Sequence, residues 1–153
     1  MAYRLALAAA VAIVAALIAA LALSNRGAAQ DDPFAETAEV LLDGRPYVVY
    51  LADTPAKWVR GYMNATSYDP RGVGAIGMLF LFDKNATWCF WMHDTPIWLK
   101  IIWVQGTEVT KAAIANPFND TAVCGYGDKA LEVDPEIPTP THVSLRLTET
   151  GGR

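Results

Sequence analysis

The hydrophobic pattern of the chain is densest in its middle, where apolar runs cover residues 77–82, 90–95 and 97–104. A polar break at residues 83–85 follows the first run, and Pro96 separates the other two. Each run is about six to eight residues long and rich in aromatic or β-branched side chains, which is typical of strands and too short for a helix. The pattern therefore predicts three strands that are buried on one or both faces.

Alternation along these strands sorts their side chains into two faces. On the second run, Trp91 and His93 share a face and Met92 lies on the other. On the third run, Trp98 and Lys100 share a face. One face of each run therefore combines aromatic and polar side chains, and these two faces are the candidates for chemistry.

The segments on either side predict further strands and one short helix. Asp43-Gly44 between two alternating segments is typical of a β-hairpin with a tight turn. Thr54 and Pro55 predict the start of a short helix that Gly61 ends. Strands are also expected at residues 108–115, 130–133 and 142–147, with a loop at residues 116–128. We therefore expect a mainly β fold over residues 38–150, a compact barrel-like or sandwich-like domain with one short helix.

A different pattern begins the chain, since residues 5–23 are uninterrupted Ala, Leu, Val and Ile after Arg4. A helix of this length would be about 28 Å long, close to the thickness of the bilayer hydrocarbon. Residues 1–26 are therefore expected to be a transmembrane signal anchor, or a signal peptide that is cleaved, and residues 27–37 a tether. Arg4 favours the inside for the N-terminus, which places the domain outside a cell membrane, single-pass, or secreted after cleavage.

Cysteines and glycosylation motifs agree with an extracellular domain. Cys89 and Cys124 are the only two cysteines. In an oxidising compartment they are expected to form a disulfide, and two buried free thiols are the alternative. Asn64, Asn85 and Asn119 each begin an Asn-x-Thr motif in a predicted turn or strand edge, so we expect a glycoprotein where the machinery exists.

Length, charge and composition limit the kinds of partner that the protein is expected to bind. A length of 153 residues leaves room for one domain and an appendage. The net charge is −4, and the 12 Lys and Arg residues are scattered. Because a phosphate backbone is bound by a basic stripe, we expect no nucleic acid partner. The expected partners are the membrane, through the N-terminal helix, and a cell-surface glycan or protein.

Four short motifs resemble the domain of unknown function 192 family, with matches over roughly residues 48–134, about the length of a small domain. The resemblance implies a small, mainly β, often exported domain and no established reaction. The chain departs from the family pattern where it has His93-Asp94 and Trp98-Leu99-Lys100, so acid and base exchange places. The motifs are Arg60-Gly61-x-Met63, Gly77-Met78-Leu79-Phe80, Phe90-Trp91-Met92 followed by Thr95, Ile97 and Leu99, and Leu131-Glu132-Val133.

The favoured function is an extracytoplasmic ligand- or partner-binding module of the cell envelope. Aromatic platforms next to polar groups suit a sugar or a peptide. A lone buried lysine would be costly, so Lys100 is expected to pair with Asp94 or to reach solvent at a cleft mouth. The predicted ligand-binding residues are Arg60, Trp91, His93, Asp94, Trp98 and Lys100.

Other functions remain open at this point. A small hydrolase is disfavoured, because neighbours such as His93 and Asp94 point to opposite faces of a strand and Cys89 lies roughly 13 Å from His93. Cys89, Met92 and His93 could bind copper, with Met63 and Met78 nearby, but methionines beside aromatic residues more often fill a core. The tryptophans could also fill the core of a structural or interaction protein of the cell surface. We expect no cofactor and favour a binding protein over an enzyme.

Overall fold

The computed structural model describes residues 31–146. The predicted membrane or signal helix over residues 5–23, and residues 27–30 of the tether, lie outside the described residues. Among the residues that are described, no helix has the length and apolar character needed to cross a membrane. The predicted mainly β fold with one short helix is confirmed.

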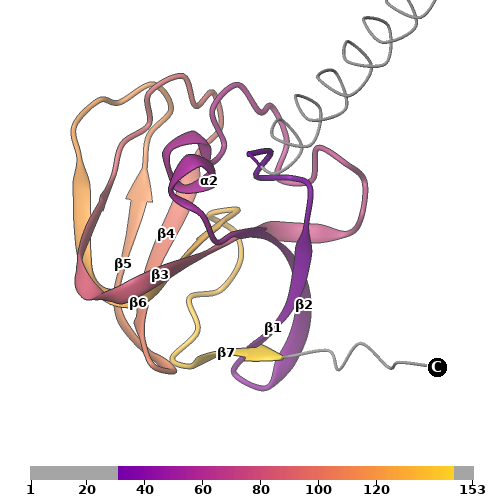
Figure 1. The fold of residues 1–153 in the computed structure, drawn as a ribbon, viewed down its shortest axis with the longest axis vertical. Coiled ribbons are helices and arrows are strands. Elements are labelled where there is room, and N and C mark those ends of the chain that lie inside the picture. Colours follow the sequence, from indigo (N-terminus) through magenta and orange to yellow (C-terminus); the bar gives the residue numbers. More distant parts are fainter. Residues whose placement is uncertain (1–30, 147–153) are drawn as a thin grey trace, which may run out of the picture. The chain divides into compact units, whose positions relative to one another are not determined.

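Seven strands form one mixed sheet in the order β5-β4-β6-β3-β2-β1-β7 (Figure 1). All neighbouring strands are antiparallel except β2 and β3, which are parallel and connected through the helix. The strands are β1 (Thr37–Leu42), β2 (Arg45–Ala52), β3 (Ala75–Phe90), β4 (Leu99–Gln105), β5 (Glu108–Ala115), β6 (Val123–Val133) and β7 (Val143–Arg146), and the helix is α2 (Pro55–Arg60).

The sheet curves strongly but is not a closed barrel. Its edge strands, β5 and β7, approach each other only at their ends, where Glu108 and His142 form an isolated β-bridge. Backbone bonds of Val109 N–H to Thr141 O and of Val143 N–H to Thr107 O extend the contact, at 3.0 and 2.8 Å. The expected barrel is therefore an open sheet whose edges are joined at one point.

The central strand β3 corrects the predicted strand boundaries. It runs through the polar break at residues 83–85, because a register shift against β6 between Leu81 and Ala86 lets the strand bend there with its polar side chains exposed. The strand then ends at Phe90, so Met92 and His93 lie in a turn. The alternation predicted for residues 90–95 does not apply to them.

A second correction concerns β6, which begins well before the predicted start of the strand at residue 130. Glycine lowers strand propensity, so Gly125 and Gly127 give no local indication of a strand in the segment predicted as a loop. In the fold, a Cβ on Gly125 would lie 2.3 Å from the Trp103 ring, and one on Gly127 would lie 2.2 Å from the Val104 carbonyl oxygen. The strand thus requires glycine at both positions because the neighbouring strand packs directly against its backbone.

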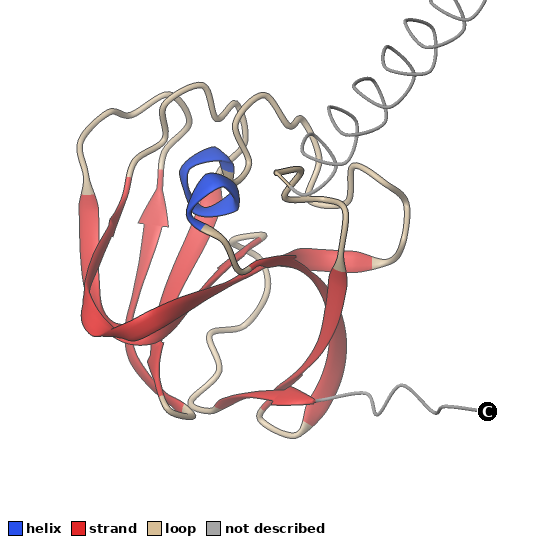
Figure 2. Cartoon of the chain, in the orientation of Figure 1, coloured by secondary structure: helices blue, strands red, loops and turns tan. Residues whose placement is uncertain are grey.

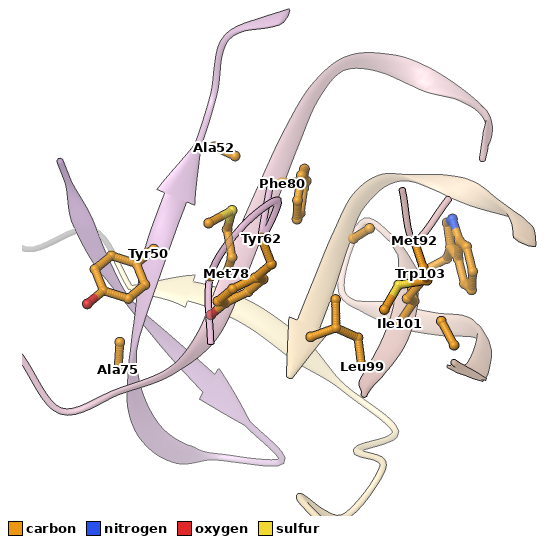
Figure 3. Packing of buried hydrophobic residues seen from close by; sticks show 13 residues of the cluster. Tyr50, Ala52, Tyr62, Ala75, Met78, Phe80, Met92, Leu99, Ile101 and Trp103 are labelled. Atoms are coloured by element: carbon orange, nitrogen blue, oxygen red, sulfur yellow. The ribbon is translucent and has the colours of Figure 1, made fainter. Parts of the chain in front are cut away.

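Both faces of the sheet carry apolar side chains, which form two clusters. The cluster around Tyr50, Met78, Phe80 and Trp103 is shown in Figure 3. The second cluster, around residues such as Leu131, covers the opposite face. The described domain therefore has a core on each side of its sheet.

Helix α2 lies over the first of these faces (Figures 1 and 2). The predicted boundaries are confirmed: Thr54 Oγ1 accepts a hydrogen bond from Lys57 N at 3.3 Å, Pro55 is the first helical residue, and Gly61 ends the helix at φ 43°. Trp58 Nε1 donates to the carbonyl oxygen of Ala52 at 3.0 Å. The helix is thus fixed to the end of β2, with its Trp58 side pointing at the sheet.

Candidate functional site

A cavity of about 360 Å³ lies between helix α2 and strands β3 and β6. This size falls within the range of small-molecule sites. Its lining is rich in aromatic residues and has few polar side chains. It is lined by Pro55, Trp58, Val59, Arg60, Gly61, Tyr62, Met63, Phe80, Phe82, Trp88, Cys89, Phe90, Trp91, Thr95 and Glu132.

Alternation along β3 builds the aromatic wall of this cavity. Phe80 and Phe82 before the bend, and Trp88 and Phe90 after it, all line the cavity from even-numbered positions of the strand. Phe82 and Trp88 stack with ring centroids 4.0 Å apart, and Trp58 from α2 meets both edge-on at 5.3 and 5.7 Å. Phe80 and Phe90 form a further edge-to-face pair at 5.0 Å. The result is a wall of interlocked rings that needs no ligand to hold its shape.

Glu132 is the buried acid of the cavity. It lies on β6 opposite Met78 of β3 and Ile101 of β4, and it is 4% exposed. Its Oε2 atom has no hydrogen-bond partner among the described residues. Burial raises the pKa of Glu132 to about 8. A buried polar atom without a partner normally costs free energy, so this carboxyl group calls for a functional explanation.

The end of helix α2 leaves space beside this carboxyl group. A Cβ on Gly61 would lie 3.4 Å from Phe80 and 3.7 Å from Glu132 Oε2. Since glycine has no Cβ, this position stays open. Gly61 therefore both ends the helix and leaves room beside the carboxyl oxygen.

The two hydroxyl side chains of the lining already have partners. Tyr62 donates its hydroxyl hydrogen to the Tyr68 carbonyl oxygen at 2.8 Å, and burial, followed by the charge of Glu132, raises the pKa of Tyr62. Thr95 donates to the carbonyl oxygen of His93 at 3.2 Å. Glu132 is consequently the cavity's main unsatisfied hydrogen-bonding group.

Only some of the six predicted ligand-binding residues line the cavity. Arg60 and Trp91 line the cavity, and Trp91 is 52% exposed. His93, Asp94 and Trp98 do not line it. Trp98 is 51% exposed, so neither Trp91 nor Trp98 is enclosed in the core.

His93 and Asp94 form a polar cluster in the turn after β3. His93 Nδ1 lies 3.0 Å from Asp120 Oδ1, and its Nε2 lies 3.6 Å from Asp94 Oδ2. The hydrogen bond to Asp120, with the charge of Asp94, raises the pKa of His93. The prediction that these neighbours point apart was wrong, because they lie in a turn where Asp94 has φ 50°. The His93 ring also stacks on Trp91 at 5.2 Å.

Lys100 is bound elsewhere. Its ammonium group donates to the carbonyl oxygen of Ile137, so the expected pair with Asp94 is not formed. The segment between β6 and β7 reaches Lys100, which sequence spacing did not reveal. Lys100 is therefore bonded to the segment between β6 and β7, and not to Asp94 in the turn that carries His93.

Cys89 and Cys124 are joined by a disulfide across the directly paired strands β3 and β6. A sulfur in a disulfide is not a thiolate, so the alternative of a copper site around Cys89 loses its strongest ligand. Within residues 31–146, no three His, Cys, Asp or Glu side chains gather where they could hold a metal ion. The asparagines of the three glycosylation motifs are exposed, and their modification stays a prediction.

Sequence reasoning missed the buried acid and most of the aromatic wall. Trp58, Phe82, Trp88 and Phe90 read as ordinary core residues. The missed signal was Glu132 itself, an acid in the otherwise apolar run at residues 130–133, the end of β6. Because Glu132 lies two residues after Ala130 on the same strand, the two side chains share the buried face. An unpaired carboxylate is unexpected there.

Comparisons with known proteins agree with this fold. A protein from Sinorhizobium meliloti 1021, described provisionally as a transcription regulator, superposes with a TM-score of 0.62 at 19% identity, covering 72% of this chain and 94% of its own. A protein of unknown function from Novosphingobium aromaticivorans superposes with a TM-score of 0.60 at 28% identity, covering 71% and 84%. No curated protein matches the chain. The sequence profile of DUF192, described as an uncharacterized ACR, matches residues 38–144, and the chain therefore belongs to the DUF192 family.

Proposed function

We propose that the protein is a binding module of the cell envelope whose ligand enters the cavity under α2. The observation that best supports this proposal is the Glu132 carboxyl group. It is buried at an aromatic cavity, and one of its oxygens has no hydrogen-bond partner among the described residues. A protein interior normally satisfies such a group, and a ligand would satisfy it here. The location at the membrane is part of the same proposal, and it is based on the apolar run at residues 5–23.

The family resemblance supports the same location. All four motifs that carry the resemblance contribute to the cavity lining, although they are far apart in the sequence. Their contributions are Arg60, Gly61 and Met63 from the first motif, Phe80 from the second, Phe90, Trp91 and Thr95 from the third, and Glu132 from the last. Each motif that makes the chain similar to its family therefore contributes at least one residue to this cavity.

Binding can be tested with a panel of small soluble probes on the full-length protein. Simple sugars, short peptides, aromatic alcohols and organic amines would be screened by ligand-observed NMR. The matched variants are Trp88→Leu, in the cavity wall, and Trp98→Leu, outside the cavity. We expect at least one probe class to bind, with the signal lost in W88L and kept in W98L.

Two results would count against the cavity. Loss of binding in W98L with retention in W88L would move the site to the surface around Trp98 and Lys100. Absence of binding across all classes, with both variants folded by near-UV circular dichroism, would favour a structural or interaction role at the cell surface.

A further inference from the structure

We infer that the group that enters the cavity is an organic cation, a methylated or primary ammonium, held among the aromatic rings against the Glu132 carboxylate. This inference rests on the proposed function and names the ligand class of the same site.

The charges of the lining leave Glu132 without an ionic partner among the described residues. Lys57, buried on the same helix, is held by Asp53 and Glu36 at 2.8 and 3.4 Å. Arg60 is exposed, and no salt bridge joins it to Glu132. The remaining titratable group of the lining is Tyr62, and the Cys89 sulfur is in a disulfide. An incoming cation would therefore meet an uncompensated carboxyl group.

Aromatic rings complement a cation specifically. The face of each ring carries partial negative charge, and tryptophan attracts ammonium groups most strongly. Trp58, Trp88 and Trp91 line the cavity together with three phenylalanines. Their attraction strengthens where water is excluded, as it is beside a carboxyl group that is 4% exposed.

The hydrogen-bonding capacity of the lining argues against a sugar. Each hydroxyl group of a buried sugar needs a partner, or it costs free energy. Here the hydroxyl groups of Tyr62 and Thr95 already donate to backbone carbonyl oxygens. The lining then offers a buried ligand few side-chain groups, namely Glu132, the exposed Arg60 and the indole N–H of the half-exposed Trp91. An organic ammonium, in contrast, has one charged group surrounded by methyl or methylene groups. It needs only one carboxylate and apolar contact, and this lining supplies both.

Proton coupling distinguishes a cation from a neutral ligand. Burial keeps the Glu132 carboxyl protonated at neutral pH, with a pKa of about 8. A cation stabilises the ionised form, so its binding would release a proton. Its affinity should rise up to tenfold per pH unit below about pH 8 and then level off.

The experiment uses two probes of nearly equal shape, choline and 3,3-dimethylbutan-1-ol, which differ in charge. Choline does not titrate, so any pH dependence of its affinity belongs to the protein. Calorimetric titrations of the full-length protein at pH 6, 7 and 8 would be run on the wild type and on Glu132→Gln. E132Q preserves shape and removes the unfavourable ionisation, so it is expected to fold.

We expect choline to bind at least tenfold more tightly than the alcohol at pH 8, with affinity rising with pH and proton release visible as a buffer-dependent heat. E132Q should lose both the preference and the pH dependence. Equal binding of the two probes, pH-independent choline binding, or no choline binding would overturn the inference. The proposed function would survive any of these results if another probe class bound in a Trp88-dependent manner.

Discussion

At the residue scale, Glu132 is the residue whose surroundings the structure reveals and the sequence does not. Its position in an apolar strand could be read from the chain, and its parity placed it on the buried face. The absence of a partner could not be read, since this depends on where helix α2 ends and on the missing side chain of Gly61. A charged residue in a buried strand is therefore a signal whose meaning only the neighbouring elements reveal.

The buried acid makes the stability of the protein depend on pH. In the unfolded chain Glu132 ionises near 4.5, whereas in the folded protein its pKa is about 8. Between these values the unfolded state binds fewer protons, so this group's contribution is full below pH 4.5 and lost as the pH rises towards 8. The free energy of unfolding should fall by about 1.4 kcal/mol per pH unit over this window, as an upper bound.

Urea unfolding at pH 5, 6.5 and 8 measures this slope in wild type and Glu132→Gln. The difference between the two proteins should grow with pH in favour of E132Q. Parallel pH profiles would show that Glu132 ionises normally in the folded state.

At the element scale, the capped helix and the hairpin were predictable because their signals are local. Asp43 and Gly44 adopt positive φ angles of 48° and 83°, as the turn requires. The bend of β3 and the full length of β6 were not predictable, because polar residues and glycines were read as strand ends. In both cases a neighbouring strand provides the pairing that overrides local propensity.

The helix cap offers a test of this local reasoning. Thr54→Ala removes the hydrogen bond to Lys57 N, and we expect a loss of about 1 kcal/mol in the free energy of unfolding. Thr54→Ser keeps the oxygen and should lose little. Chemical denaturation checks both variants, and equal stability of T54A and wild type would mean that tertiary contacts alone hold the helix.

The disulfide belongs to the same scale, since it links β3 to β6 at the rim of the cavity. It closes a loop with a sequence separation of 35 residues. The double substitution of Cys89 and Cys124 to Ser should therefore lower the free energy of unfolding by roughly 3–4 kcal/mol in the chain-entropy model. The single substitutions provide the comparison, and a loss below about 1 kcal/mol would contradict the model's main assumption that the bond restricts the unfolded chain.

At the scale of the whole domain, the curved sheet is completed by a small polar cluster at its edges. Asp43, in the hairpin turn, accepts hydrogen bonds from Thr141 N, Thr141 Oγ1 and His142 N at 2.8 to 3.1 Å. His142 Nε2 lies 2.9 Å from Glu108 at the start of β5. The backbone hydrogen bond from His142 lowers the pKa of Asp43. No sequence pattern connects these residues, which are brought together only by the fold.

Loss of this cluster should loosen the edge strand before the rest of the sheet. In Asp43→Ala, we expect amide hydrogen exchange of Val143 and Leu145 to accelerate at least tenfold, with exchange in β3 and β6 unchanged. Asp83→Ala, at an exposed position in the bend of β3, serves as the control. Uniform acceleration across the sheet would mean that the cluster stabilises the whole domain rather than its edge.

The proposed binding site depends on an unpaired carboxyl group that responds to a ligand. Carbon-13 NMR of the glutamate carboxyl groups, with Glu132→Gln for assignment, follows Glu132 directly. We expect a titration midpoint near 8 in the free protein, displaced to lower pH by saturating choline. A midpoint near 4.5 that choline leaves unchanged would rule out the proposed role of Glu132.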